Sequence, residues 1–461
     1  MLGGVAAVAG CAHYRPQPLS PAQTAAQFDA RRLHSPGLND FLAQQLGHPP
    51  EKWPLEKWDL PSLTLAAFYF HPDLAVARAQ WRVAEAGVET AGGRPNPTLS
   101  VTPEYNVTTL VPSPWGPSVN FDLPLETMGK RAKRLAAAEK TAESARWNFA
   151  SAAWQIRSGV RAALLDFGIA GRRAGLLQKQ FAAQAEIVKL LQDRFDAGAI
   201  ARPELTLAQI ALNKTQQDLG AAQSTRAEAR ARLAQALGVG LAALDGVKLE
   251  PGFSADVPAA LTAAEARGVA LRGRADVLGA LADYAAAEAG LRLEIAKQYP
   301  DVHLNPGYQY DQGDSKWSLG LSVDLPVLNQ NQGPIAEAEA RRKLAAAKFL
   351  ALQARVSGEI DRAVAGVRVA REQLETGKKL IAAEMQRQKS AEAQLQAGAG
   401  ERLDLLNAQL ETSNASVTQL DNEAKLQAAI GALEDALQSP GDQIAAAIEK
   451  NSSENPSHSS K

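Results

Sequence analysis

The sequence predicts a mainly α-helical protein with a small β part, built from one unit that occurs twice. Hydrophobic residues make up 46% of the chain but aromatic residues only 5%, and an alanine-rich, aromatic-poor composition favours closely packed helices. Long stretches place Leu, Ile and Val at three- and four-residue spacing, which is the helical period. Short motifs also return about 200 residues later, which indicates an internal duplication.

The duplication is visible in motifs that keep their order. The Asp-Leu-Pro tripeptide at 122–124 recurs at 324–326, and Ala-Gly-Ala at 197–199 recurs at 397–399. Several such matches at nearly one offset indicate a duplicated unit and not unrelated domains. The predicted divisions are a lipoprotein signal at 1–10, an irregular lipidated leader at 11–60, a first repeat at 61–238, an equatorial linker at 239–260, a second repeat at 261–438 and a C-terminal tail at 439–461 with a disordered end.

Each half contains two runs in which apolar and polar residues alternate: Pro97–Thr108 and Ser118–Leu125, then Val302–Asp311 and Trp317–Val327. Period two predicts strands with one buried face, and each run has roughly the 9–11 residues of a tilted membrane strand. Two ordinary hairpins of a soluble domain would alternate in the same way. As membrane strands, four are too few, because about eight are needed to close a barrel. The predicted lipid face consists of Leu99, Val101, Phe121, Leu319, Leu321 and Val323.

The rest of both repeats is predicted to be helical. The longest helices would each measure roughly 100 Å at 1.5 Å per residue, and pairs of shorter helices stacked end to end would match them. That arrangement predicts a tall wall of helices. The alternative, a long soluble coiled coil, would explain the helices but leave the strands without a role. The predicted helices are Ser62–Arg94, Gly129–Ala197, Pro203–Gly238, Leu261–Tyr299, Pro334–Ala397 and Leu403–Gln438.

The N-terminus resembles a bacterial lipoprotein signal. Small apolar residues lead to Val8-Ala9-Gly10 immediately before Cys11, the one cysteine of the chain, so we expect cleavage and lipidation at Cys11. The alternative is a small buried cysteine. No Lys or Arg precedes the apolar run, so we expect that the true start lies upstream of Met1.

Composition excludes several classes of function. A formal net charge of −1 argues against nucleic-acid binding, which requires a basic surface. One cysteine and six scattered histidines provide no metal-ligand motif. There is no glycine-rich phosphate loop and no hydrolase or metalloprotease motif, so we expect no enzyme, no metal site and no cofactor apart from the lipid.

The order helix, strand pair, long helix, shorter helix, repeated over residues 60–440, resembles the TolC-like outer-membrane efflux family. Gly-Lys-Arg at 129–131 and Asn-Gln-Asn-Gln-Gly at 329–333 are most similar to its heavy-metal (CzcC-type) RND efflux branch. The resemblance implies a homotrimer with a 12-stranded barrel in outer-membrane lipid, a helical tunnel across the periplasm and an equatorial belt that contains the linker.

The resemblance also implies two functional regions. The turns at 197–204 and 397–404 would be the tips that meet a periplasmic adaptor (membrane fusion) protein, with contacts at Gly198, Ala199, Arg202, Gly398, Gly400 and Arg402. Asp404 matches the first of two acids that line the family's closed pore, whereas Asn407 departs from the second. Glu204 is the first-repeat counterpart of Asp404. The alternative role for Asp404 is an acid favoured at a helix start by the helix dipole.

The function that we predict is a passive exit duct driven by an inner-membrane RND-type pump, lipid-anchored in the outer membrane and extending into the periplasm. Branch resemblance favours metal cations as cargo. A drug, solvent or type I secretion channel of the same fold remains an alternative. A periplasmic coiled-coil adaptor or scaffold lipoprotein without a pore is the alternative from another class.

Overall fold

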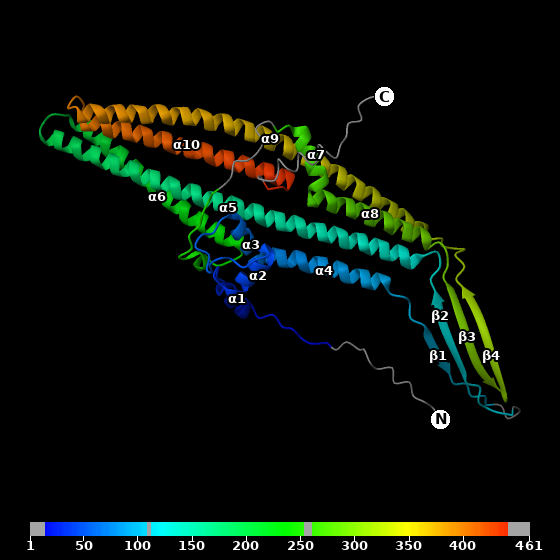
Figure 1. The fold of residues 1–461 in the computed structure, drawn as a ribbon. Coiled ribbons are helices and arrows are strands. Elements are labelled where there is room, and N and C mark those ends of the chain that lie inside the picture. Colours follow the sequence, from blue (N-terminus) through cyan, green and yellow to red (C-terminus); the bar gives the residue numbers. More distant parts are fainter. Residues whose placement is uncertain (1–13, 108–111, 253–260, 441–461) are drawn as a thin grey trace, which may run out of the picture.

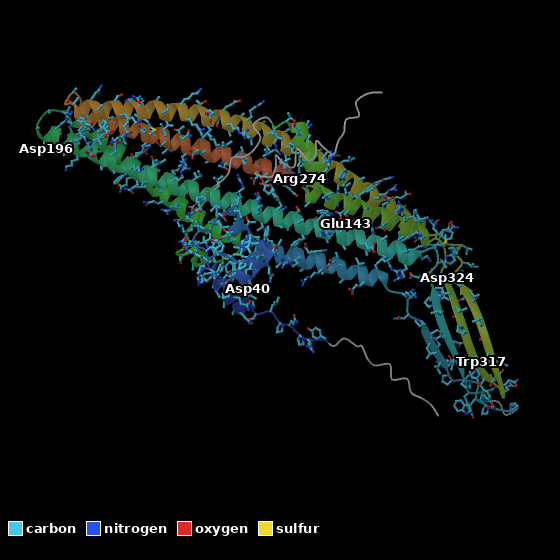
Figure 2. All side chains as sticks on the ribbon, viewed as in Figure 1. Asp40, Glu143, Asp196, Arg274, Trp317 and Asp324 are labelled. Atoms are coloured by element: carbon cyan, nitrogen blue, oxygen red, sulfur yellow. The ribbon has the colours of Figure 1, made fainter. Side chains whose placement is uncertain are left out.

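The computed structural model describes residues 14–107, 112–252 and 261–440. Long helical hairpins form one end of an elongated molecule, and a small bent sheet forms the other (Figure 1). Two labelled side chains mark the ends of the long axis of the molecule. Asp196 lies at the far helical end, and Trp317 lies near the far end of the sheet (Figure 2). The termini of the described chain lie near the middle.

The helices confirm the predicted mainly α-helical, duplicated architecture. The first repeat contains α3 (Leu60–Phe70), α4 (Pro72–Gly92), α5 (Lys130–Asp196) and α6 (Arg202–Leu237). The second repeat contains α7 (Ala263–Gly273), α8 (Ala275–Ala296), α9 (Gln332–Gln396) and α10 (Arg402–Leu437). A short 3-10 helix, η1 (Leu241–Leu244), follows α6.

Two predicted helices are wrong in one respect, because each is broken near its start. His71 and Arg274 have extended backbones, with ψ of 123° and 127°. Pro72 disfavours the helical conformation at the residue before it, which accounts for the first break. The second break has no proline, and there the buried Arg274 side chain binds the carbonyl oxygen of Ala436 at 2.8 Å.

The leader is not irregular as predicted, because it contains α1 (Pro21–Asp29) and α2 (Pro36–Leu46). Both begin with a proline in the first turn, where proline is well tolerated. Two of the seven prolines of the leader, Pro21 and Pro36, therefore start helices. Trp58 of the leader is 2% exposed and packs in the core of the first repeat.

The long helices form a single wall. Their order across this wall is the same on the sheet side of the short helices α3 and α7 as on the side of the hairpin tips. On one side α5 packs against α4 and α6; on its other side it packs against α8 and α10, which in turn pack against α9. The order across the wall is therefore α4 or α6, then α5, then α8 or α10, then α9. The two outer edges are α4 with α6, and α9.

The four strands form one antiparallel sheet in the order β1-β2-β3-β4. Strands β2 and β3 match the predicted runs, β1 is shorter, and β4 begins and ends earlier than predicted. A tight turn with φ of 52° at Gln312 and 102° at Gly313 joins β3 to β4, as expected for a two-residue hairpin. The strands are β1 (Thr98–Thr102), β2 (Ser118–Leu125), β3 (Val302–Asp311) and β4 (Asp314–Val323).

Three apolar clusters hold the wall together. One packs the leader and α3 against α5 and α6, a second joins α7, α9 and α10, and a third lies near the hairpin ends between α5, α6 and α10. Within the described ranges, no helix is both long enough and apolar enough to cross a membrane.

Candidate functional site: the hairpin tips and the faces of the sheet

Both hairpin tips are closed by a glycine in the left-handed conformation. Gly198 has φ of 72° and Gly398 has φ of 70°. The next residue in each tip donates its N–H to a carbonyl of the preceding helix, Ala199 to Arg194 at 2.8 Å and Ala399 to Gln394 at 2.9 Å. This geometry satisfies helix-end carbonyls and strongly favours glycine, so the two tips share one backbone design.

The structure brings the two tips together through ion pairs that sequence reasoning missed. Arg194 contacts Glu401 at 2.7 Å, and Arg402 contacts Glu186 at 2.8 Å. Hydrogen bonding to Glu401 raises the pKa of Arg194, and the negative charges of Glu204 and Asp404 raise it further. Acids of both tips therefore lie around one guanidinium group. The pairs join residues more than 200 positions apart, so no local sequence pattern could reveal them.

Asp404 and Asn407 both lie on the exposed side of α10, one turn apart, while Leu405 and Leu406 point into the protein. Asp404 Oδ2 accepts a hydrogen bond of 3.3 Å from the backbone N–H of Glu401. Asp404 therefore stabilises the start of α10 in the single chain, as the helix-start alternative expects. Its carboxylate remains exposed to solvent.

The predicted adaptor-contact residues all lie at the hairpin tips. Five of the six are exposed, whereas Gly400 is half-buried against the end of α9. The set comprises Gly198, Ala199, Arg202, Gly398, Gly400 and Arg402. Cys11, the predicted lipidation site, lies outside the described residues.

The sheet separates an apolar face from a polar face. Cross-strand pairs join Leu99 to Phe121 and Leu304 to Leu321, so apolar residues from all four strands share one side. Exposed fractions on that side are high for a water-soluble surface: Leu99 62%, Val101 62%, Phe121 37%, Leu319 73%, Leu321 70% and Val323 41%.

The opposite face of the sheet carries hydrogen-bonded polar side chains. His303 Nδ1 lies 2.9 Å from Asp122 Oδ1, and Asn305 Nδ2 donates to Ser322 Oγ at 3.0 Å. Strands β1 and β4 are the two edges of this sheet, so each has one side without a strand partner within the described chain.

Among the described residues, no group of three or more His, Cys, Asp or Glu side chains is placed to hold a metal ion. The molecule instead offers surfaces: a two-faced sheet at one end, a wall of long hairpins, and paired tips at the other end.

Comparison with known proteins assigns the family. The sequence profile of the outer membrane efflux protein family matches residues 60–239 and 267–438, so the chain belongs to this family. The family consists of export channels and not of enzymes, and its two matched segments coincide with the two structural repeats.

Similar proteins agree with this assignment. The chain is 24% identical over 356 residues to the cobalt-zinc-cadmium resistance protein CzcC of Cupriavidus metallidurans. The aligned region covers 76% of this chain and 82% of CzcC. The fold resembles the outer membrane protein VceC of Vibrio cholerae, with a TM-score of 0.68, 20% identity and coverage of 83% and 96% of the two chains. It also resembles CusC, with a TM-score of 0.65, 18% identity and coverage of 82% and 91%.

Proposed function

We propose that three copies of this chain assemble into an outer-membrane export channel. The observation that carries this proposal is that the sheet and the helical wall end in matching edges. Strand β1 lies on the same edge as α4 and α6, and β4 lies on the same edge as α9. One copy can therefore pair its β4 and α9 edge with the β1 and α4/α6 edge of the next copy.

Such head-to-tail contacts produce a closed ring when the rotation between copies closes. Three copies with four strands each give a twelve-stranded barrel, which exceeds the roughly eight strands required for closure. The ring also satisfies the edges of the sheet, which are otherwise open to pairing with other chains. A scaffold without a pore would have no need for these two edges.

In this barrel the apolar face of the sheet contacts lipid and the polar face lines a water-filled path, as in known membrane barrels. The helical wall continues that path through the periplasm toward the hairpin tips. We propose that the tips meet a periplasmic adaptor, that an inner-membrane RND-type pump supplies the energy, and that lipid on Cys11 anchors the chain to the outer membrane.

Metal cations are the proposed cargo, because the relative CzcC is described as a cobalt-zinc-cadmium resistance protein. Deletion of the gene followed by growth on a panel of metals and drugs tests the assignment. Sensitivity to divalent metals supports it, whereas sensitivity to drugs alone assigns the channel to the alternative class of cargo.

The barrel itself is tested by paired substitutions at neighbouring positions of β4. Arginine at Leu321, on the apolar face, should cost about 2–4 kcal/mol near the bilayer midplane and reduce the yield of trimers. Ser322→Arg should be tolerated and change only the conductance. If Ser322→Arg abolishes trimers while Leu321→Arg does not, the proposed faces are inverted.

Asp404 is proposed to form the periplasmic constriction, together with Asn407, which lies one helical turn farther along α10. Three copies of Asp404 around the axis would form a negative ring of the kind that favours cations in other pores. Asp404→Ala should lower cation selectivity and raise single-channel conductance, and Glu204→Ala should do less. If Asp404→Ala changes only thermal stability, the helix-start contact with Glu401 is its whole role.

A further inference from the structure

A histidine lies among acidic side chains on the polar face of the sheet, near the end where the strands join the long helices. His303 is the second residue of β3, and Asp324 directly follows β4 at this junction (Figure 2). Asp122 and Asp324 are the acids of the two Asp-Leu-Pro motifs, one in each repeat. In the proposed barrel, on which this inference rests, the polar face lines the water-filled path.

Asp122 holds the imidazole of His303 through one of its two ring nitrogens. Nδ1 of His303 lies 2.9 Å from Oδ1 and 3.2 Å from Oδ2 of Asp122. An ionised carboxylate only accepts hydrogen bonds, so Nδ1 carries the proton, and in the neutral ring the lone pair is on Nε2. The two side chains are 34% and 40% exposed, so a solute in the path can reach the ring. A carboxylate on one ring nitrogen is the arrangement that orients a histidine toward a metal cation.

The polar groups around His303 are paired with each other, except for one acid. Asp301 is bound by Lys130 at 2.7 Å, and Asn305 donates to Ser322 at 3.0 Å. Asp324 is exposed and has no ion-pair or hydrogen-bond partner within the described ranges. It lies two residues beyond Ser322, the cross-strand partner of His303, and residues two apart along a strand share a face. Its unneutralised charge would attract cations to this level of the path.

The duplication shows that the histidine belongs to one repeat only. Pro300 of the second repeat corresponds to Pro97 of the first, so the counterpart of His303 is Ser100. In the proposed ring β4 pairs with β1 of the next copy, which places Asp324 beside Ser100 as Asp122 lies beside His303. Three acid–histidine pairs would therefore alternate with three single acids around the path, and only the pairs provide a ring nitrogen.

We propose that these groups form a contact site for borderline divalent metal cations, such as Zn²⁺, at the periplasmic end of the barrel. His303 supplies one nitrogen ligand, Asp122 orients the ring, Asp324 attracts the cation, and water completes the coordination shell. Imidazole suits Zn²⁺, whereas Mg²⁺ prefers oxygen ligands and retains its waters. Among the described residues no three ligating side chains lie together, so the contact is weak, and a weak contact lets an ion leave as well as enter.

Single-channel recording of purified trimers in a planar bilayer tests this proposal. Zn²⁺ that pauses at His303 should reduce the K⁺ current, and Mg²⁺ at the same concentration should reduce it much less. His303→Gln keeps an amide that can donate to Asp122 but has no ring nitrogen, so most of the Zn²⁺ effect should be lost while the Mg²⁺ effect stays. The matched control is His48→Gln, at an exposed histidine of the leader, which should respond like the wild type.

Two acid variants separate orientation of the ring from simple attraction of charge. Asp122→Asn removes the carboxylate that orients His303 and should raise the Zn²⁺ concentration for half-block about tenfold, with a smaller change for Mg²⁺. Asp324→Asn removes an equal charge at the same end of the barrel without a contact to His303. It should weaken the effects of Zn²⁺ and Mg²⁺ by the same factor.

The proposal is overturned if the trimers conduct but His303→Gln responds to Zn²⁺ like the wild type, because His303 then serves only to join two strands. It is also overturned if Asp122→Asn and Asp324→Asn change the Zn²⁺ and Mg²⁺ responses alike. A purified protein that forms no trimer or conducts no current instead contradicts the proposed function, and the contact site with it.

Discussion

The breaks at His71 and Arg274 occupy equivalent places in the two repeats but are stabilised in different ways. Each break separates a short helix, α3 or α7, from the helix that leads to the sheet, α4 or α8. The two breaks lie 203 residues apart. Neither break could be replaced by a continuous helix without moving the short helix out of its core. The backbone design is therefore common to both repeats, and the side chains that hold it are not.

The first break is held by the leader. Arg31, which precedes the repeat, donates to the carbonyl oxygens of Phe70 at 2.8 Å and Gly238 at 2.6 Å. The end of α6 approaches so closely that a Cβ on Gly238 would lie 2.8 Å from the Cα of His71. This junction is tightly packed, with Leu63 and Leu237 fully buried beside it.

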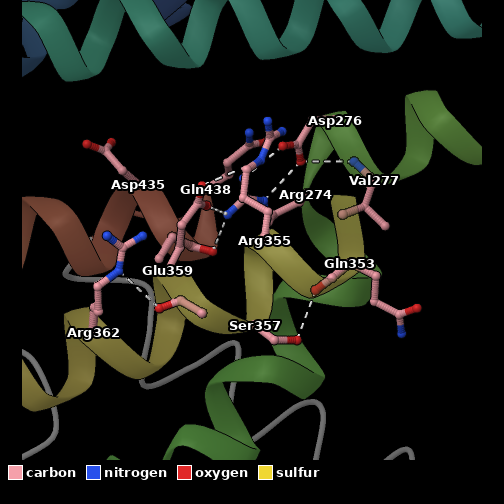
Figure 3. Close-up of polar contacts among 12 residues, drawn as sticks. Arg274, Asp276, Val277, Gln353, Arg355, Ser357, Glu359, Arg362, Asp435 and Gln438 are labelled. Atoms are coloured by element: carbon pink, nitrogen blue, oxygen red, sulfur yellow. Dashed lines mark hydrogen bonds and ion pairs between the residues drawn. The ribbon is translucent and has the colours of Figure 1, made fainter. Parts of the chain in front are cut away.

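The second break is held from within the repeat. Arg274 is 5% exposed and contacts Asp276 at 2.7 Å and Glu359 at 3.0 Å (Figure 3). Gln438, the counterpart of Gly238, uses its side-chain oxygen to accept the N–H of Ala275 at 2.7 Å. A cavity of about 670 Å3 adjoins this network between α5, α9 and α10. The comparison teaches that the same backbone arrangement can be stabilised by the leader in one repeat and by ion pairs within the repeat in the other.

The largest effect is expected from Arg274→Ala. Removing this side chain leaves Asp276 and Glu359 partly buried with only the more distant Arg355 as a neighbouring cation, and loss of one partner of a buried pair costs about 3 kcal/mol or more. The midpoint of denaturant unfolding, followed by circular dichroism, should fall clearly. Arg272→Ala, at an exposed position two residues earlier near the end of α7, is the matched control; equal losses in both variants would mean that the network does not hold the junction.

Gly238→Ala should have a somewhat smaller effect, at about 2–3 kcal/mol, because the new Cβ meets the backbone of His71 in a residue whose φ is 72°. The second repeat supplies the control, since Gln438→Ala at the equivalent place should lose only about 1 kcal/mol with its hydrogen bond. Thermal unfolding of both variants measures the difference. A Gln438→Ala loss as large as that of Gly238→Ala would show that the two junctions are packed alike.

Arg31→Ala tests whether the leader acts as a clamp. Two hydrogen bonds from a charged donor are lost, which is expected to cost about 1.5–3 kcal/mol in total, discounted for partial exposure. The measurable sign is faster proteolysis of the leader together with faster amide hydrogen exchange at the start of α4. If exchange increases equally at the start of α8, the substitution has loosened the whole equator and the clamp is not local.

The smallest expected effect is a dependence of the second junction on acid pH. Burial raises the pKa of Asp276, but its hydrogen bonds and attraction to Arg274 outweigh burial and hold the pKa below its ordinary value of 3.8. A folded-state pKa below the unfolded value contributes stability above about pH 3.8 that is lost as pH falls through the folded pKa. Amide exchange near Ala275 should therefore increase below that pH before exchange near His71 does; the reverse order would contradict the ionic account.

Much of the fold could be predicted from local patterns. Alternation over Val302–Asp311 predicted β3 to the residue, and glycines at 198 and 398 marked both hairpin tips. These signals depend on residues close in sequence, so the chain carries them without reference to its neighbours. The leader helices were missed because the leader was interpreted as irregular chain, although Pro21 and Pro36 stand where prolines are tolerated at helix starts.

The sequence by itself determined the class of the protein: the duplication, the long helices, the strand pairs and the two-faced alternation along them. The tertiary structure alone decided which distant side chains meet. It placed Arg194 beside Glu401, closed the break at Arg274 with Glu359, and put Arg31 on the end of α6. Secondary structure follows from local periodicity, whereas these contacts depend on how whole helices pack, and a partner more than 80 residues away leaves no periodic trace in the chain.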